Sequence, residues 1–161
     1  MSGSHLVRAG LLAAAICLPC STTQAAMSPF TAMAGSWSGG GVIKLSDGSG
    51  EPLRCRATYD VAGGGAELRL NLRCASASYQ FDLSSEVAYH GGAISGSWTE
   101  ASRNASGTLS GRATGDHIEV AAQGQSFSAN LSLTTRGNRQ SISIRPVGTD
   151  ITSVSLSLDR H

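Results

Sequence analysis

Two cysteines and three histidines are the residues beyond the N-terminal segment best suited to covalent or metal chemistry. They are Cys55, Cys74, His90, His117 and His161. A zinc site takes several Cys or His ligands at close spacing, and these five residues form no such cluster. An even pair of cysteines in an exported chain is instead typical of a disulfide. We therefore expect a Cys55–Cys74 bridge, no metal and no cofactor.

Serine is abundant, but no serine stands in an arrangement that would activate it as a nucleophile. The sequence has no Gly-x-Ser-x-Gly motif, and the neighbours Asp116 and His117 do not place a base against a hydroxyl. The run Gly39-Gly40-Gly41 precedes a strand pattern rather than a helix, so it does not predict a phosphate-binding loop. We predict that the protein is not an enzyme.

Arginine supplies nearly all of the positive charge, and guanidinium groups bind phosphate and carboxylate well. Two groups of arginines are candidates for contact with an anionic envelope component: Arg54, Arg56 and Arg73, and Arg136, Arg139 and Arg145. The 12 Lys and Arg are balanced by 11 Asp and Glu, giving a net charge of +1. This balance argues against nucleic acid as a partner.

The first 25 residues have the layout of a signal peptide. Arg8 precedes an apolar run over 11–18, and small residues follow as far as Ala25. A lipoprotein anchor is the alternative, but neither Cys17 nor Cys20 follows the small residue that such an anchor requires. We expect cleavage after Ala25, which leaves residues 26–161 as one secreted or periplasmic domain with no membrane-spanning segment.

From residue 36 onward, apolar residues recur at every second position, the period of strands with one buried face. Folding the chain about Gly64-Gly65 places Val61 opposite Leu68 and, in the same register, Cys55 opposite Cys74. Opposed Cα atoms in an antiparallel pair lie about 4.5–5.5 Å apart, within the range of a disulfide. The strand pattern thus supports the bridge.

The same register makes two predictions about charged residues on the outer face. It sets Arg69 opposite Asp60, where we expect an ion pair, and Arg56 opposite Arg73, a mildly unfavourable pair of like charges.

Four more glycine-containing centres predict tight hairpins. They pair Tyr89 with Ile94, Ala113 with Ile118, Ala122 with Phe127, and Leu133 with Ile142. The strands are expected near 36–46, 52–61, 67–74, 78–89, 93–100, 105–113, 117–123, 126–134, 139–146 and 151–158. A break at Ser84-Ser85 is the alternative for the fourth segment.

This pattern predicts an all-β fold: an antiparallel up-and-down meander of about ten strands. A long twisted sheet leaves exposed edges unless it closes, so we expect a barrel, with a two-layer β-sandwich as the alternative. The segment 28–33 is expected to form one turn that plugs the floor of the barrel.

Gly35-Ser36-Trp37 and the later Gly96-Ser97-Trp98 carry a resemblance to lipocalin-like, or calycin, barrels. In those proteins a short turn leads into a Gly-x-Trp whose ring packs across the base, and a cavity takes a small apolar ligand. The chain lacks a recognisable second lipocalin signature. Its Gly-Ser-Trp-Ser-Gly-Gly start and the segment 135–141 also resemble small exported proteins of unknown function from rhizobial alphaproteobacteria.

Five glycines share the inward parity of the two tryptophans: Gly39, Gly41, Gly96, Gly107 and Gly111. They either leave space for a ligand or permit tight coiling around a filled core.

The aromatic side chains expected to line a ligand cavity are Trp37, Tyr59, Tyr79, Phe81, Tyr89, Trp98 and Phe127. The sequence favours an exported barrel that binds a small apolar or amphipathic ligand. The alternative is a structural or surface-interaction protein with a filled core and no ligand.

Overall fold

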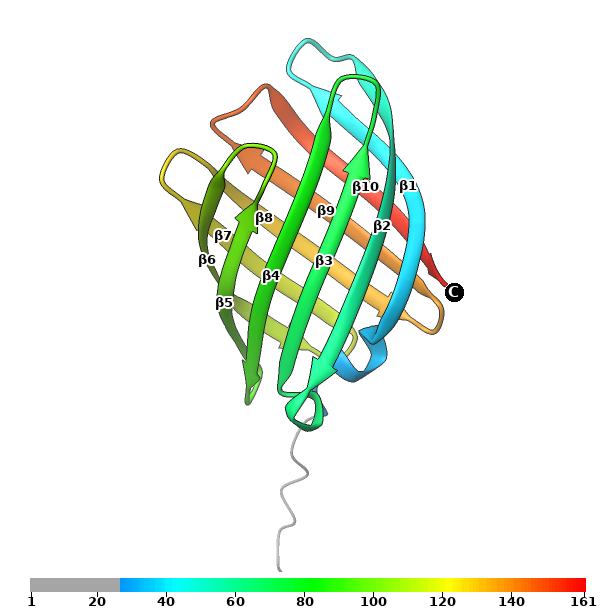
Figure 1. The fold of residues 1–161 in the computed structure, drawn as a ribbon, viewed down its shortest axis with the longest axis vertical. Helices are drawn as coiled ribbons and strands as arrows, with labels where there is room; N and C mark the ends of the chain where they lie inside the picture. Colours follow the sequence, from blue (N-terminus) through cyan, green and yellow to red (C-terminus); the bar gives the residue numbers. More distant parts are fainter. Residues whose placement is uncertain (1–26) are drawn as a thin grey trace, which may run out of the picture.

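The computed structural model describes residues 27–161 and shows a closed barrel of ten antiparallel strands (Figure 1). The predicted signal peptide lies outside the described residues. The strands are β1 (Gly35–Leu45), β2 (Gly50–Ala62), β3 (Glu67–Ala75), β4 (Gln80–His90), β5 (Ala93–Glu100), β6 (Ala105–Thr114), β7 (His117–Gly124), β8 (Ser128–Arg136), β9 (Arg139–Val147) and β10 (Ile151–Arg160). Each strand pairs with its neighbours in sequence, and β1 pairs with β10 to close the ring, so the barrel is confirmed over the sandwich.

The register of the β2–β3 hairpin is confirmed residue by residue. Val61 lies opposite Leu68, and Cys55 lies opposite Cys74, to which it is bonded. Both sulfurs are on the inner face, because the two cysteines are only 3% and 5% exposed. Strand β4 runs without a break through Ser84-Ser85.

One of the predicted hairpins is wrong by two residues. Ala122 lies opposite Ala129 rather than Phe127, because Gln125 and Ser126 form the turn and the Gly124 amide donates to the Phe127 carbonyl. A shift of two positions keeps every side chain on its predicted face. The pairs at the other three centres are as predicted.

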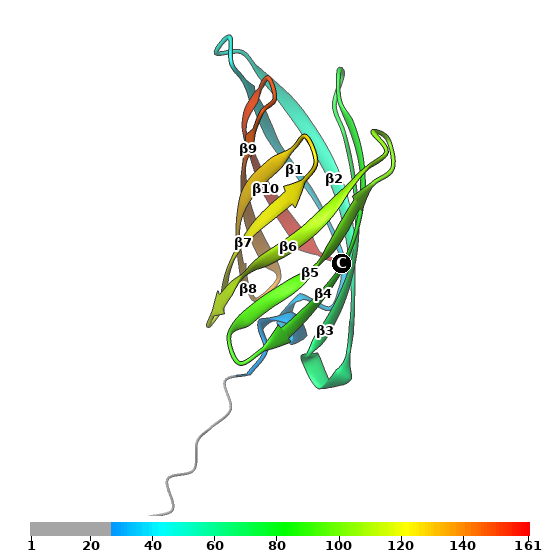
Figure 2. The same ribbon diagram turned by 90° about the vertical axis from the view of Figure 1, so that its left-hand side faces the viewer.

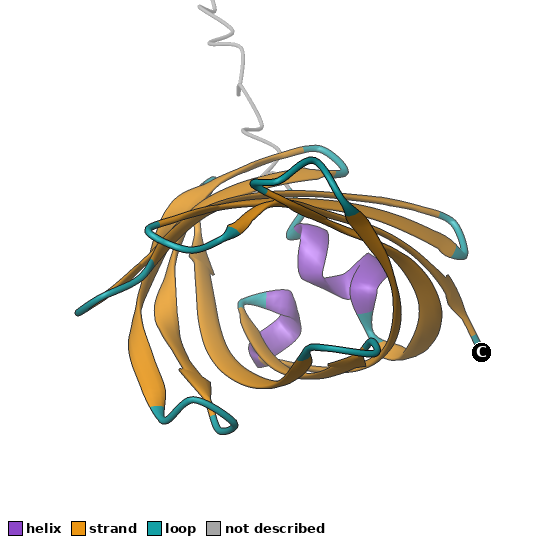
Figure 3. Cartoon of the chain, turned by 90° about the horizontal axis from the view of Figure 1, so that it is seen from above, coloured by secondary structure: helices purple, strands orange, loops and turns teal. Residues whose placement is uncertain are grey.

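Two short 3-10 helices close one end of the barrel, as Figures 2 and 3 show. Helix η1 (Pro29–Met33) is the predicted floor turn, and η2 (Gly63–Gly65) lies between β2 and β3. Phe30 and Met33 of η1 are 1% and 2% exposed, so the turn is packed into the barrel as a plug.

The inward glycines permit tight coiling instead of leaving space. A Cβ on Gly39 or Gly41 would lie 2.0 or 1.7 Å from a backbone oxygen of β10. Gly107 and Gly111 on β6 meet backbone oxygens of β7 in the same way, as Gly96 meets one of β4. Since β1 and β6 lie opposite each other in the ring, close approaches of neighbouring strands occur on both sides of the barrel, and the ring in Figure 3 is wider than it is deep.

No helix within residues 27–161 is both long and apolar enough to cross a membrane.

We predict that Gly41→Ala lowers the free energy of unfolding by about 1–3 kcal/mol, because the new methyl group would force β1 away from β10. Gly50→Ala is the matched control: its Cβ would meet no atom closer than 3.4 Å, and we expect a change within about 0.5 kcal/mol. Urea unfolding of both variants measures the difference. Equal stability of the two would mean that the close strand contact is not needed.

Candidate functional site

Three of the aromatic residues expected to line a cavity are packed into the floor. Trp37 and Tyr59 meet edge to face with ring centroids 6.5 Å apart, and Tyr89 meets Phe30 of η1 at 6.1 Å. Trp37, Tyr59 and Tyr89 are 1%, 3% and 8% exposed. Their rings therefore seal the floor, and a ligand in the upper barrel would rest above them.

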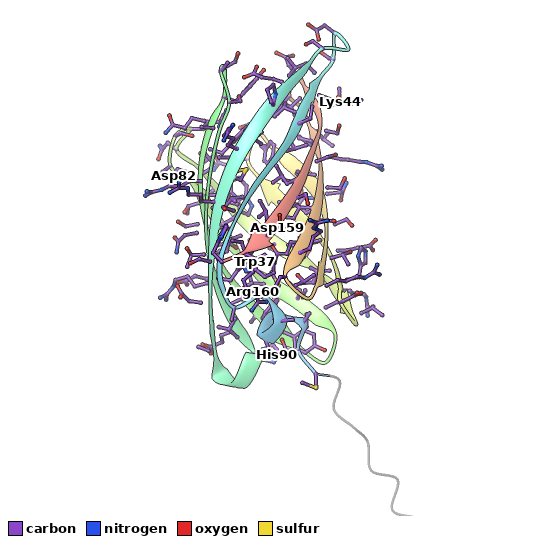
Figure 4. All side chains as sticks on the ribbon, turned by 90° about the vertical axis from the view of Figure 1, so that its right-hand side faces the viewer. Trp37, Lys44, Asp82, His90, Asp159 and Arg160 are labelled. Atoms are coloured by element: carbon purple, nitrogen blue, oxygen red, sulfur yellow. A yellow bond between two sulfur atoms is a disulfide. The ribbon has the colours of Figure 1, made fainter. Side chains whose placement is uncertain are left out.

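Arg160, near the end of β10, lies beneath this floor. Its guanidinium carbon is 4.6 Å from the centre of the Trp37 ring, and its Nη2 donates to the carbonyl oxygen of Ala32 (Figure 4). Trp37 in turn donates from Nε1 to the Met33 carbonyl at 2.7 Å. A cation over an indole face is attractive, so the pair ties the last strand to the floor turn. The alternation of Val154, Leu156 and Leu158 in the sequence also predicts that Arg160 faces inward.

A buried polar chain completes the floor. The Tyr59 hydroxyl donates to Gln140 Oε1 at 3.0 Å, and Gln140 Nε2 donates to Thr135 Oγ1 at 3.2 Å. Gln140 is 0% exposed. Burial raises the pKa of the Tyr59 phenol, which outweighs the opposite effect of the Gln140 hydrogen bond, so the phenol stays protonated. Tyr59, Gln140 and Thr135 thus pair with one another, whereas the Nε of Arg160 is buried with no hydrogen-bond partner within residues 27–161.

Above the floor, the inner wall is aliphatic and partly exposed. The inward side chains of intermediate exposure are Leu70, Leu72, Leu83, Val87, Leu109, Val120, Leu131, Leu133 and Ile144. These residues lie within strands rather than at turns, and their strands are paired on both sides within the sheet. All nine pack against at least one of the two buried apolar clusters, and Val120 and Leu131 also line a hollow of the outer wall. Together they form an aliphatic inner wall, which a search of the sequence for aromatic residues does not find.

The remaining predicted aromatic residues lie toward the open end. Tyr79 and Phe81 stack with centroids 6.3 Å apart, while Trp98 and Phe127 meet edge to face at 5.8 Å. The Trp98 ring covers Gly107, and its Nε1 is buried with no hydrogen-bond partner in residues 27–161. These two aromatic pairs come from β4 with its preceding loop, and from β5 with the β7–β8 turn.

The turn between β5 and β6 brings Arg103 close to Glu100 at the open end of the barrel. Glu100 is 7% exposed and accepts from the amides of Asp82, Ser102 and Arg103 and from the Ser102 hydroxyl. Arg103 lies 3.6 Å from the Glu100 carboxylate, and its guanidinium carbon is 4.6 Å from the centre of the Phe81 ring. Burial alone would raise the pKa of Glu100, but the hydrogen bonds outweigh it and hold the pKa below its usual value.

The first arginine group lines a hollow on the outer wall over β1–β4. The hollow has a volume of about 1020 Å³ and a glycine floor at Gly39 and Gly40, with Arg54, Arg56 and Arg73 around it. Arg73 pairs with Asp82 at 3.4 Å. Among residues 27–161, no carboxylate lies within ion-pair distance of Arg54 or Arg56.

The predicted Arg69–Asp60 ion pair is wrong, although the two residues are opposed as expected. Arg69 binds Glu86 on its other neighbour, β4, at 3.1 Å, because a long side chain can reach either adjacent strand.

The second arginine group is divided by its ion pairs. Arg136 pairs with Asp116 at 2.7 Å and Arg139 with Asp159 at 3.1 Å. Arg145 lines a second outer hollow, of about 590 Å³, together with Arg112 and Glu119. The structure therefore does not gather the second group into one site.

Within the described residues, no group of three or more His, Cys, Asp and Glu side chains is placed to hold a metal ion. His117 lies on the outer face, where its ring nitrogens are 2.8 Å from Thr134 Oγ1 and 3.3 Å from Glu119 Oε1.

The ten sequential strands define a closed antiparallel up-and-down β-barrel. The chain is similar to Rv2717c from Mycobacterium tuberculosis, with a TM-score of 0.64, 16% identity, and coverage of 81% of this chain and 94% of that one. It is also similar to the S-type phycobiliprotein lyase CPES from Guillardia theta, with a TM-score of 0.63, 10% identity, and coverage of 89% and 98%. No family model and no curated protein matches the sequence. At these identities the likeness shows the fold alone.

The Glu100 carboxylate should make the stability of the barrel depend on pH. Because its pKa is lowered in the folded state, its contribution is complete above the ordinary value of 4.5 and is lost as the pH falls through the folded pKa. We expect Glu100→Gln to lower the free energy of unfolding by about 1–3 kcal/mol at pH 7, since an amide cannot accept from all of these donors.

Urea unfolding at pH 7 and pH 3 measures this dependence, and the difference between wild type and variant should shrink at pH 3. A difference that is the same at both pH values would show that the ionised carboxylate has no special role.

Proposed function

We propose that the protein binds a small apolar or amphipathic ligand in the lumen of its barrel. The observation that carries this proposal is the row of partly exposed inward aliphatic side chains above a fully packed floor. Apolar surface held in contact with water costs about 25 cal/mol per Å², and a ligand that covers it recovers that free energy. A concave, mostly apolar space with a few polar groups at one end is the usual form of a small-molecule site.

A filled structural core fits these side chains less well. The buried apolar residues form two clusters, one at the floor and along β1, β2 and β10, and a smaller one around Trp98. Ile144 is among the half-buried residues that contact both. Because a smaller satellite cluster beside the main core is also common in filled domains, the proposed lumen site depends on the partial exposure of the inward wall residues.

We further propose that the protein is exported. The N-terminal segment has the composition of a signal peptide, and cleavage after Ala25 would release residues 26–161 as the barrel. The Cys55–Cys74 disulfide supports this, because such bonds persist in oxidising compartments such as the periplasm or the exterior. The proposed role requires neither catalysis nor a cofactor.

The lumen site can be tested with the apolar fluorophore N-phenyl-1-naphthylamine. We expect the wild-type barrel to bind it and Leu131→Trp to weaken binding about tenfold, because the larger ring fills the lumen. Ser132→Trp is the matched control, since the next residue of β8 faces outward between Glu119 and Ser143. Fluorescence titration gives the Kd values, and urea midpoints verify that both variants fold. Absence of binding to wild type, or equal loss in both variants, would refute the lumen site.

The outer hollow favours a second function, contact with an anionic envelope component. Arg54 and Arg56 point into a concave surface without a carboxylate partner among the described residues, and Arg56 directly opposes Arg73. An anion between opposed guanidinium groups would relieve their repulsion.

Binding to alginate, an anionic polysaccharide, tests the second function. We expect Arg54→Gln/Arg56→Gln to weaken binding about tenfold and to reduce its dependence on salt. Arg112→Gln/Arg145→Gln removes the same charge from the second hollow and should have a smaller effect. Equal effects of the two double variants would indicate that only net charge matters.

A further inference from the structure

We propose that the ligand of the lumen is an anionic amphiphile whose head group is held by Arg103 at the mouth. This inference rests on the proposed lumen site and names the chemical class that the site accepts. It assigns the apolar body of the ligand to the aliphatic wall and its carboxylate, or a group of the same charge and shape, to the β5–β6 turn.

Arg103 can be placed relative to the lumen because its guanidinium lies over the aromatic ring of Phe81. Phe81 is opposite Cys74 in the β3–β4 register, and the Cys74 side chain is on the inner face. Phe81 therefore faces the lumen near the upper ends of its strands, and the Arg103 guanidinium lies over that ring. The β5–β6 turn stands at the end of the barrel opposite the floor helices (Figure 1).

The guanidinium is held in place before any ligand arrives. Glu100 accepts from the Arg103 amide at 2.8 Å, and the Arg103 Nη1 donates to the Gln80 carbonyl at 3.0 Å. The buried carboxylate thus fixes the turn, while the carbonyl and the Phe81 ring fix the side chain. A donor that is already ordered loses little entropy on binding, which favours affinity.

Part of the Arg103 guanidinium remains available to bind a ligand. Its partners within the described residues are both on Nη1, namely the Gln80 carbonyl and the Glu100 carboxylate at the longer distance of 3.6 Å. The side chain is 46% exposed. The edge formed by Nε and Nη2 can therefore receive a carboxylate through two parallel hydrogen bonds.

Besides Arg103, the polar groups of the inner wall within residues 27–161 suit a charged head group less well, and the unpartnered Trp98 Nε1 is a single neutral donor. The inward Ser85 hydroxyl already donates to the Ser97 carbonyl at 2.8 Å. Glu100 is shielded by its own donors, and the other inward guanidinium, Arg160, is at the opposite end beneath Trp37. A head group inside the aliphatic lumen would lose its hydration without compensation, so it belongs at the mouth.

Displacement of N-phenyl-1-naphthylamine by dodecanoate and by 1-dodecanol, both below their aggregation limits, tests the inference. We expect Arg103→Gln to weaken dodecanoate about tenfold and to leave dodecanol within about twofold, because only the acid uses the guanidinium. The Glu100 bond to the Arg103 backbone amide survives this substitution, and the urea midpoint verifies the fold. Arg112→Gln, which removes an outward charge on β6, is the control and should affect neither compound.

The outcomes separate the two proposals. Dodecanoate weakened selectively in Arg103→Gln supports the head-group site. If both compounds displace the fluorophore from wild type and Arg103→Gln changes neither, or changes both alike, the head-group site is refuted while the lumen site stands. If neither compound nor the fluorophore binds wild type, the lumen site itself fails.

Discussion

The close approach of β1 to β10 is the contact on which the barrel depends. Ten sequential strands make a sheet whose two edges must meet, and they meet where Gly39 and Gly41 let carbonyl oxygens of β10 occupy the space of a side chain. Glycines on β6 do the same against β7 on the opposite side of the ring. A methyl group at these positions would hold the strands apart, and an open sheet would expose unpaired edges. Closure of the barrel therefore depends on the absence of side chains at these glycines as well as on the packing of the inward side chains.

The two ends of the barrel differ in how tightly their inward side chains are packed. At the floor, the plug residue Phe30 and the inward Trp37 fill the barrel, and Arg160 ties the last strand to the plug. At the other end there is no equivalent plug among the described residues, and the inner wall stays partly exposed. The floor is therefore the more tightly packed end, and the proposed ligand site lies at the other. A barrel filled throughout would be more stable, but it would have no room for a ligand.

Much of the fold could be predicted because alternation and register are properties of the chain itself. The parity of residues 53–74 fixed which side chains face inward, and the opposed cysteines fixed one hairpin. Ala122 was paired wrongly because several small residues near Gly124 allow turns of the same parity. The site was less predictable. The parity identified inward aromatic residues without showing that Tyr59 would be sealed in the floor, and Arg103 is placed by a turn whose shape depends on buried Glu100.

Strands and turns would contribute differently to recognition of the proposed ligand. The strands contribute an aliphatic lumen wall, with residues such as Leu72 and Leu131, and aliphatic contacts discriminate weakly between apolar ligands of similar size. In the proposed lumen site, the orientation and selectivity of a ligand would then come from polar groups at the mouth, which belong to the turns and adjoining strand ends. Glu100 stands where these two parts meet, because it is the last residue of β5 and the acceptor that shapes the turn. In the proposed site, changes in the turn would thus alter ligand preference while the glycine-dependent closure, and with it the fold, stays the same.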